Sequence, residues 1–399
     1  MKRLKGVEES MSRTIIIIFI LSVGIKLSAQ DDVRIRLFAD SNLGNALFSV
    51  VEGIYEIDSY KGEPVELKPG DIVFITVYQD RLVAKQRTKP AILCDSLNIK
   101  AKTVNDIFSL RADGIRRYYS GNLNCFGFTG KLLLINIVDT ESYIAGVVQA
   151  EGGKGKHKEY YKTQAVIART YLYKHYDKHI LDRYNLCDGI HCQSFKGMSD
   201  DTVIIRAAEE TRDQVILDSD SILIISAFHS NCGGETVPAE DAWLTPQPYL
   251  RKVTDPFCTA SRNAKWQKSI GLDEWLAYIR RMGYNTGDNN TSALNFSQLT
   301  RMKDYRINDF SLPLKQIRTD MGLRSTFFSV SAAGDSVILK GRGYGHGVGL
   351  CQEGAMVMAQ KGFDYRQIID FYYSGVWITD IKNVTPQPPL KGGYKPISN

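Results

Sequence analysis

The sequence lacks a long apolar run beyond its N-terminus, and it lacks a strong charge of either sign. Its 399 residues have a formal net charge of +6, which is too mild for the basic surface typical of nucleic-acid binding. With 43% hydrophobic and 24% charged residues, the composition excludes a disordered chain, a collagen and a coiled coil. We therefore expect a globular protein of several regions, without a nucleic-acid partner and without a stable transmembrane segment.

Cysteine is also sparse, with seven residues in the whole chain. Because their number is odd, at least one thiol is unpaired or bound to a metal. Cys232 and Cys258 are candidates for a disulfide in an exported protein.

Export is predicted by the N-terminus, where four basic residues precede the apolar run 15–25 and small residues follow at 28–29. A charged start, a short apolar core and small residues are typical of a secretory signal. The run is shorter than the ~20 residues that a membrane-spanning helix needs. We predict a signal peptide over residues 1–29, and a mature protein in the periplasm or cell envelope.

The predicted fold class is α+β, with mixed strands and helices. Alternating apolar and polar residues in the first third of the chain indicate half-buried strands. Later segments predict a strand over 131–138, a helix starting at Asp139 or Thr140, a helix over 159–176, and a hairpin of 214–217 with 222–228. The predicted regions are a signal peptide (1–29), a strand-rich N-terminal region (30–116), the first part of a core (117–258), a smaller inserted helical subdomain (259–325), the C-terminal part of the core (326–380) and a disordered tail (381–399).

Glu151 is a candidate general acid, because it follows an apolar helical stretch and precedes two glycines. Partial removal from water would raise its pKa and let it hold a proton near neutral pH. A surface glutamate before the end of a helix is the alternative.

Further along, Arg169 lies among small and apolar residues of the 159–176 helix. It would either orient a substrate or carboxylate, or form a structural ion pair.

Cys187, His191 and Cys192 bring two thiols and an imidazole within six residues. Zinc takes such ligands. The alternatives are a local Cys187–Cys192 disulfide, or neither a metal nor a disulfide.

A second unusual segment, 341–349, has glycine at every other position. In an extended chain these glycines share one face, so a ligand or another strand would approach the backbone there. Tyr344 and His346 lie on the other face.

Several motifs in the same order resemble the stage II sporulation protein D family, also called the amidase-enhancer family. The matching stretches, between about residues 117 and 376, are GVVQAE, KTQAVIARTY, CDGIHCQSFKG, FHSNCGGET, PYLRKV, LRSTFF and GRGYGHGVGLCQEGAMVMAQKG. The loop after Glu151 departs from many relatives, since Gly-Gly-Lys-Gly-Lys-His stands where they have a Met-Pro beginning.

The resemblance implies a peptidoglycan lytic transglycosylase that cleaves the MurNAc–GlcNAc bond of glycan strands, with Glu151 as the catalytic acid and base. It implies no required cofactor, although some relatives bind zinc, for which Cys187, Cys192 and His191 are the matching candidates. We assign substrate contacts to Gln164, Arg169, Tyr344, Gly345 and His346.

Two alternatives remain besides the transglycosylase. The first is a non-catalytic glycan-binding protein that enhances an N-acetylmuramoyl-L-alanine amidase, which would then be a partner. The second is a zinc hydrolase, which is disfavoured because two thiolate ligands leave little room for an open catalytic position.

Overall fold

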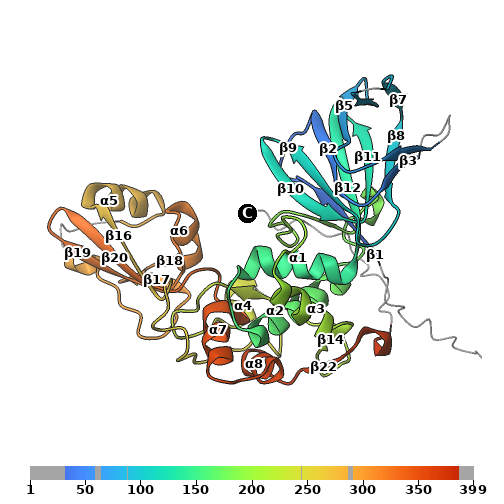
Figure 1. Ribbon diagram of the computed structural model, residues 1–399. Helices are drawn as coiled ribbons and strands as arrows, with labels where there is room; N and C mark the ends of the chain where they lie inside the picture. The colour runs from blue at the N-terminus through green and yellow to red at the C-terminus, as the bar shows by residue number, and fades with distance from the viewer. Residues whose placement is uncertain (1–31, 59–63, 88, 244, 286–290, 386–399) are drawn as a thin grey trace, which may run out of the picture.

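The computed structural model describes residues 32–385, apart from 59–63, 88, 244 and 286–290. Strands fill the N-terminal region, helices gather in the middle of the molecule, and a smaller unit of strands and helices stands to one side (Figure 1). The predicted α+β fold class is confirmed. The predicted signal peptide lies outside the described residues, among which no helix is long and apolar enough to cross a membrane.

Two sheets build the N-terminal region. The first has the strand order β13-β1-β12-β11-β8-β3-β4, and the second has the order β10-β9-β2-β5-β6-β7. Alternate residues of each strand face the core, as in β1, where Val33 and Ile35 are fully buried. The strands are β1 (Asp32–Leu37), β2 (Asn45–Glu52), β3 (Tyr55–Asp58), β4 (Val65–Leu67), β5 (Ile72–Tyr78), β6 (Arg81–Gln86), β7 (Ile92–Cys94), β8 (Ser96–Ala101), β9 (Ile107–Ala112), β10 (Ile115–Ser120), β11 (Asn122–Phe128), β12 (Lys131–Asp139) and β13 (Leu186–Cys187).

The first sheet crosses the boundary that the sequence analysis placed at residue 116. β11 and β12 lie between β8 and β1, and β13, from much later in the chain, pairs in parallel with β1. A single hydrophobic cluster extends from this region into the helices. The strand-rich region and the helical core are therefore packed together rather than joined by a linker.

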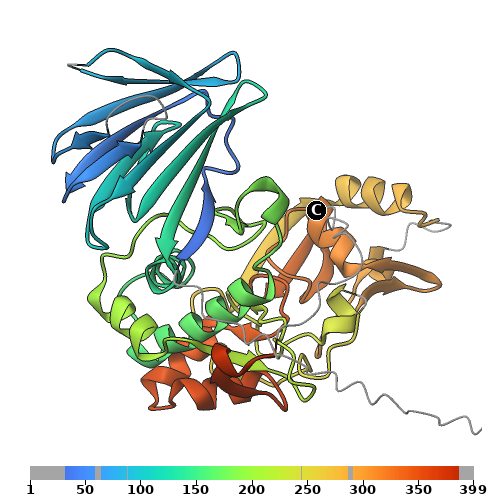
Figure 2. The ribbon, with the colours of Figure 1, turned by 90° about the vertical axis from the view of Figure 1, so that its right-hand side faces the viewer.

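Helices α1, α2, α3, α7 and α8 form a layer beneath the strands in both views (Figures 1 and 2). The long central helix α2 packs against the four others. The predicted helix over 159–176 is confirmed with slightly different ends, and Asp139 caps α1 as expected, accepting a hydrogen bond from Ser142 N at 2.8 Å. The helices of the core are α1 (Thr140–Gly152), α2 (Lys158–Lys174), α3 (Thr202–Glu210), α4 (Ala239–Trp243), α7 (Gln352–Gln360) and α8 (Tyr365–Tyr372), with a short 3-10 helix η1 (Ile180–Asp182).

The predicted hairpin of 214–217 with 222–228 forms only next to its turn, where Leu217 and Leu223 make an antiparallel bridge and Ile224 N donates to Ile216 O at 3.2 Å. As a strand, β14 (Gln214–Leu217) pairs instead with β22 (Trp377–Asp380) near the C-terminus. β15 (Phe228–His229) pairs in parallel with β21 (Leu350–Cys351). The local sequence pattern did not predict these long-range pairs, because the partner strands lie far away in the sequence, near the C-terminus.

The side unit has its own hydrophobic cluster, built around the fully buried Trp275 and Ile279. It contains more strand than the predicted helical subdomain, and it includes β19 and β20, which lie beyond the predicted limit at residue 325. Its elements are β16 (Lys265–Gly271), α5 (Leu272–Arg281), η2 (Thr291–Leu294), β17 (Asp304–Ile307), β18 (Phe310–Pro313), α6 (Leu314–Asp320), β19 (Phe328–Ala333) and β20 (Ser336–Arg342).

The start of the predicted disordered tail belongs to the fold. Ile381 is fully buried in a 3-10 helix, η3 (Ile381–Asn383), and Ile381 N donates to Asp213 O at 2.8 Å. The rest of the predicted tail, from residue 386, lies outside the described residues.

Candidate active site and candidate metal centre

Glu151 lies in the last turn of α1 and is half-buried. Its Oε1 accepts a hydrogen bond from Ser194 N at 2.9 Å. Burial raises the pKa of the Glu151 carboxyl, while the Ser194 N–H and the nearby Lys196 cation act in the opposite direction. The net upward shift favours a protonated carboxyl, as a general acid requires.

Three helices meet behind Glu151. Gln352, the first residue of α7, donates from Nε2 to the Glu151 backbone carbonyl at 3.2 Å and to Gln164 Oε1 at 3.3 Å. Gln164 lies in α2, so one side chain links α1, α2 and α7. This places the predicted residue Gln164 close to Glu151 and adds Gln352, which was not predicted although it lies three residues after the glycine-rich segment.

Polar groups without protein partners surround this point. Within the described residues, Gln164 Nε2, Gln193 Nε2 and Tyr160 Oη are buried and accept or donate no hydrogen bond. Tyr160 packs against the end of α1, since a Cβ added to Gly152 would lie 3.2 Å from its hydroxyl. Buried polar groups almost always have partners, so these three groups are candidates for binding a ligand. No sequence pattern had pointed to Tyr160 or Gln193.

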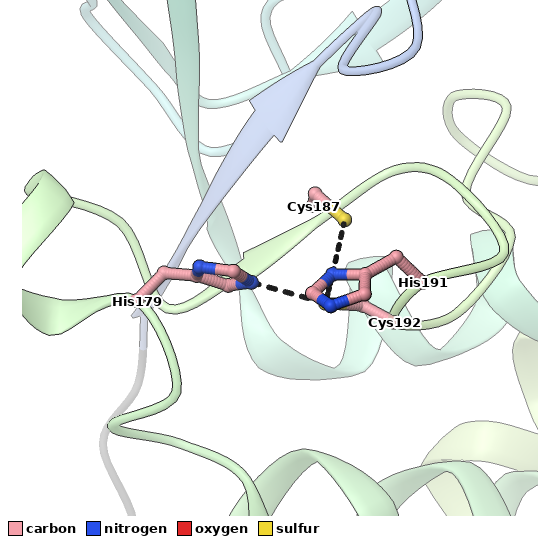
Figure 3. A group of neighbouring side chains, drawn as sticks. All are labelled: His179, Cys187, His191 and Cys192. Carbon is pink, nitrogen blue, oxygen red and sulfur yellow. Dashed lines mark hydrogen bonds between the residues drawn. The ribbon is translucent and has the colours of Figure 1, made fainter. Parts of the chain in front are cut away.

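A cluster of two cysteines and two histidines comes from the chain just before Ser194 (Figure 3). His191 Nδ1 is 3.9 Å from Cys187 Sγ and 3.8 Å from Cys192 Sγ, and His179 Nε2 is 3.6 Å from Cys192 Sγ. All four ligand atoms lie within 4.8 Å of one another. Cys187, His191 and Cys192 were predicted as ligands, while the structure adds His179, which lies before η1 and outside the predicted motif.

The donor set of this cluster fits zinc. Two thiolates and two neutral imidazoles make the four-ligand set of a closed, structural zinc site. The hydrogen bond from Cys192 lowers the pKa of the Cys187 thiol, and burial lowers the pKa of His179. Asp182 Oδ2 lies 3.6 Å from His179 Nδ1, so a carboxylate orients the imidazole from behind, as is common around metal-bound histidine.

One loop carries both cysteines of this cluster and the backbone group that binds Glu151. Cys192 lies two residues before Ser194, whose N–H binds the Glu151 carboxyl. Asp188 anchors the same loop to the N-terminal sheets, accepting from Phe38 N at 2.8 Å and from Arg117 Nη1 at 2.7 Å. Fixing this loop therefore fixes the group that orients Glu151.

Arg169 does not reach the site surface. It is fully buried and pairs with Glu141, with Nε donating to Glu141 Oε1 at 2.9 Å. It also donates to the Ala208 and Gln214 carbonyls at 3.2 Å. Of the two alternatives considered from the sequence, the structure therefore shows the structural ion pair. A substrate contact is not available to Arg169, because protein encloses every side of its guanidinium.

The bare glycine face packs against protein instead of facing a ligand. A Cβ at Gly345 would lie 2.9 Å from His229 Cβ, and a Cβ at Gly343 would lie 2.6 Å from Asn231 O. Gly345 also has a φ of +111°, so the segment is not the simple extended strand expected from the glycine spacing. The neighbouring segment therefore occupies the Cβ side of Gly345, and the substrate contact at this residue stays a prediction.

Tyr344 and His346 lie apart from Glu151 in the hydrogen-bond network. Tyr344 is 47% exposed, which leaves it accessible to a ligand. The His346 ring lies 5.4 Å from that of Trp243 and 5.6 Å from that of His229, and burial lowers the pKa of His346 to about 4. His346 Nδ1 accepts from Val348 N at 3.0 Å. Within the described residues, no hydrogen bond joins either residue to Glu151.

Comparison with known proteins finds relatives of one kind. A family model described as stage II sporulation protein matches residues 129–217, a stretch that contains Glu151, Gln164, Cys187 and Cys192. Stage II sporulation protein D of Bacillus subtilis is 28% identical over 61% of this chain and 75% of its own length. The amidase enhancer of Bacillus subtilis is 26% identical over 59% of this chain and 40% of its own length.

An uncharacterized protein of Brachyspira hyodysenteriae is 26% identical over 67% of this chain and 74% of its own length. Motifs in the same order, the family model and these relatives agree with one another. These similarities support the assignment to the family of stage II sporulation protein D and the amidase enhancer that the sequence motifs indicated.

Proposed function

We propose that this protein is a lytic transglycosylase that cleaves the glycan strands of peptidoglycan in the cell envelope. The observation that supports this best is the half-buried Glu151 carboxyl, whose pKa is raised by burial and which lies among unpartnered polar groups. A protonated carboxyl beside free hydrogen-bonding groups suits the cleavage of a polar polymer by acid catalysis.

The proposed reaction needs one carboxyl group. Glu151 donates its proton to the glycosidic oxygen as the bond from that oxygen to the MurNAc anomeric carbon breaks. The resulting carboxylate accepts the proton of the MurNAc 6-hydroxyl, whose oxygen bonds to the anomeric carbon and closes a 1,6-anhydro ring. No water is consumed, so the second carboxylate that ordinary glycosidases use for water or nucleophilic attack is not needed.

The surrounding residues have distinct roles in this proposal. Ser194 N–H holds Oε1 of Glu151, which leaves Oε2 as the oxygen that gives and recovers the proton. Gln352 fixes the end of α1 through the Glu151 carbonyl. The free amide of Gln164, the free amide of Gln193 and the Tyr160 hydroxyl would bind sugar hydroxyls or acetamido groups.

Zinc fits the cluster of His179, Cys187, His191 and Cys192 as a structural ion, because four protein ligands leave no open position. Bound there, it would crosslink the loop that carries Gln193 and Ser194. The chemistry remains that of Glu151 in this proposal, and zinc is not a reactant.

The decisive experiment is Glu151→Gln assayed on peptide-free glycan strands, with 1,6-anhydro products measured by mass spectrometry. The amide is nearly isosteric with the carboxyl but cannot donate and recover a proton. We therefore expect the rate of cleavage to fall by ~10²- to 10⁴-fold. Glu240→Gln, an exposed glutamate in α4, is the matched control and should cleave normally. Anhydro products from Glu151→Gln at the wild-type rate would contradict the assignment.

A second candidate function rests on the relative named amidase enhancer. In this case the protein binds glycan strands and stimulates an amidase without cleaving the glycan. Adding wild-type or Glu151→Gln protein to an N-acetylmuramoyl-L-alanine amidase separates the two functions. Stimulation that is equal for both proteins, without anhydro products from either, would support the enhancer and exclude the transglycosylase.

A further inference from the structure

A second group of metal-type ligands lies apart from the cluster of Figure 3. Cys232, Asp255, Cys258 and Cys351 are all fully buried, and one ligand atom from each lies within 4.8 Å of the other three. Cys232 follows β15, Cys258 lies in the loop after α4, and Cys351 ends β21. None of these residues has a part in the proposed reaction of Glu151.

The Asp255 carboxylate is the first sign of a bound cation. Its Oδ1 accepts from Phe257 N at 2.8 Å, while its Oδ2 accepts from the Tyr372 hydroxyl at 2.9 Å and lies 3.2 Å from Cys232 Sγ. No lysine, arginine or histidine in the described part of the chain forms an ion pair with it. A fully buried carboxylate without a cation is costly, and a metal ion beside Oδ2 would supply the missing charge.

The sulfur atoms have the surroundings of metal-bound thiolates. Cys351 Sγ accepts from Cys232 N at 3.3 Å and from Gly354 N at 3.4 Å, and it caps the N-terminus of the nine-residue helix α7. Backbone N–H groups and a helix N-terminus both stabilise a negative sulfur. Cys232 Sγ lies 3.3 Å from Cys258 Sγ, and all three cysteines are free thiols in the structure.

Positive charge is also placed to balance an anionic centre. Three thiolates and a carboxylate around a divalent ion leave a net charge of −2, which needs compensation in a buried site. Arg301 Nη2 donates to the Cys232 carbonyl at 2.6 Å, and Arg301 Nε donates to the Glu235 carbonyl at 2.7 Å. Its guanidinium therefore lies beside the cluster while making these hydrogen bonds to neutral acceptors.

We propose that Cys232, Asp255, Cys258 and Cys351 form a second structural zinc site, with three sulfur ligands and one oxygen ligand. Four protein ligands of this type suit zinc and close its coordination sphere. On binding, each cysteine thiol that is protonated gives up its proton to solvent. A Cys232–Cys258 disulfide, the pairing considered from the sequence, would leave the buried Asp255 carboxylate without a compensating cation.

The site would join three segments that are distant in the sequence. Cys232 and Cys351 are 119 residues apart, and Cys258 is 26 residues from Cys232. Cys351 is followed directly by Gln352, which contacts the backbone of Glu151. Zinc here would hold the beginning of α7 in place, in contrast to the first cluster, which holds the loop of Ser194.

The test is the zinc content of the exported protein, purified without a metal-affinity tag or chelator and measured by mass spectrometry of the metal. We expect two zinc ions per wild-type chain. The pair Cys187→Ser and Cys192→Ser should leave one, and the pair Cys258→Ser and Cys351→Ser should also leave one. Cys125→Ser, at a buried free cysteine in β11, is the matched control and should keep both.

X-ray absorption at the zinc edge keeps the proposal testable if the Cys258 and Cys351 variants do not fold. In the Cys187→Ser, Cys192→Ser protein the remaining zinc should have three sulfur neighbours at about 2.3 Å and one oxygen neighbour at about 2.0 Å. Wild-type protein should average more than two sulfur neighbours per zinc. A single zinc with two sulfur and two nitrogen neighbours, or a Cys232–Cys258 disulfide found by non-reducing peptide mapping, would overturn the second site. Either result leaves the Glu151 assay unaffected.

Discussion

The two cysteine clusters differ in how the chain brings their members together. His179, Cys187, His191 and Cys192 come from one short stretch between α2 and the loop that binds Glu151. Cys232, Asp255, Cys258 and Cys351 come from segments on opposite sides of the inserted unit. The first cluster is largely visible as a sequence motif, whereas the second exists only once β15 has paired with β21.

Contacts between distant segments and contacts within one loop should affect different properties of this protein, namely its stability and its activity. Contacts between distant segments should determine whether the protein folds, because they close long loops. Contacts within the 187–196 loop should mainly tune Glu151, because that loop binds its carboxyl directly. Changes at the two kinds of contact should therefore be separable by stability and by activity.

The largest effect is expected for Arg169→Ala, which breaks the buried pair between α1 and α2. Leaving Glu141 buried without its partner should lower the free energy of unfolding by ~3–5 kcal/mol, measured by urea denaturation. The double variant Arg169→Met, Glu141→Met removes both charges and should recover most of this loss. An Arg169→Ala protein with unchanged stability and a raised KM for glycan would restore the substrate contact predicted from the sequence.

A smaller loss of stability is expected for Gly345→Ala, which disturbs the packing between the glycine-rich segment and β15. The added Cβ would lie 2.9 Å from His229 Cβ, and such overpacking costs ~1–3 kcal/mol. Gly283→Ala is the matched control, because Gly283 has a similar positive φ, of +98°, but has no atom within 4 Å of its added Cβ. Melting temperatures should show the larger drop at Gly345. Equal drops would mean that backbone conformation, and not the contact with β15, sets the cost.

The smallest effect on stability is expected for Lys196→Met, within the loop beside Glu151. The Lys196 cation lowers the pKa of the Glu151 carboxyl, so its removal should raise that pKa further. Because the protonated carboxyl starts the reaction, cleavage falls as pH rises through the pKa, and the variant should keep its activity to a higher pH. The pH profile of kcat measures the shift.

Arg206→Met, at an exposed position in α3, removes a surface cation as a control for Lys196→Met. Its profile should match that of the wild type. If the profile of Lys196→Met moves to lower pH or does not move, the carboxyl that starts the reaction is not Glu151, or Lys196 does not act on it.

The sequence by itself determined the local features of this protein. The apolar pattern and the capping Asp139 define the strand 131–139 and the start of α1, and helical periodicity defines α2. The position of Glu151 at the end of α1 and the grouping of Cys187, His191 and Cys192 were also readable, because each depends on neighbours within a few residues. Periodicity, helix caps and short motifs involve residues that are close in the sequence, so they can be recognised before the fold is known.

Only the tertiary structure decided which distant groups meet. Nothing in the spacing of residues showed that Arg169 pairs with Glu141, that the glycines of 343–349 pack on residues 227–237, or that Gln352 reaches Glu151. The second cysteine cluster depends on the same kind of contact. The physical reason is that long-range pairing is chosen by the packing and burial of whole elements against each other, and one segment alone does not encode its partner.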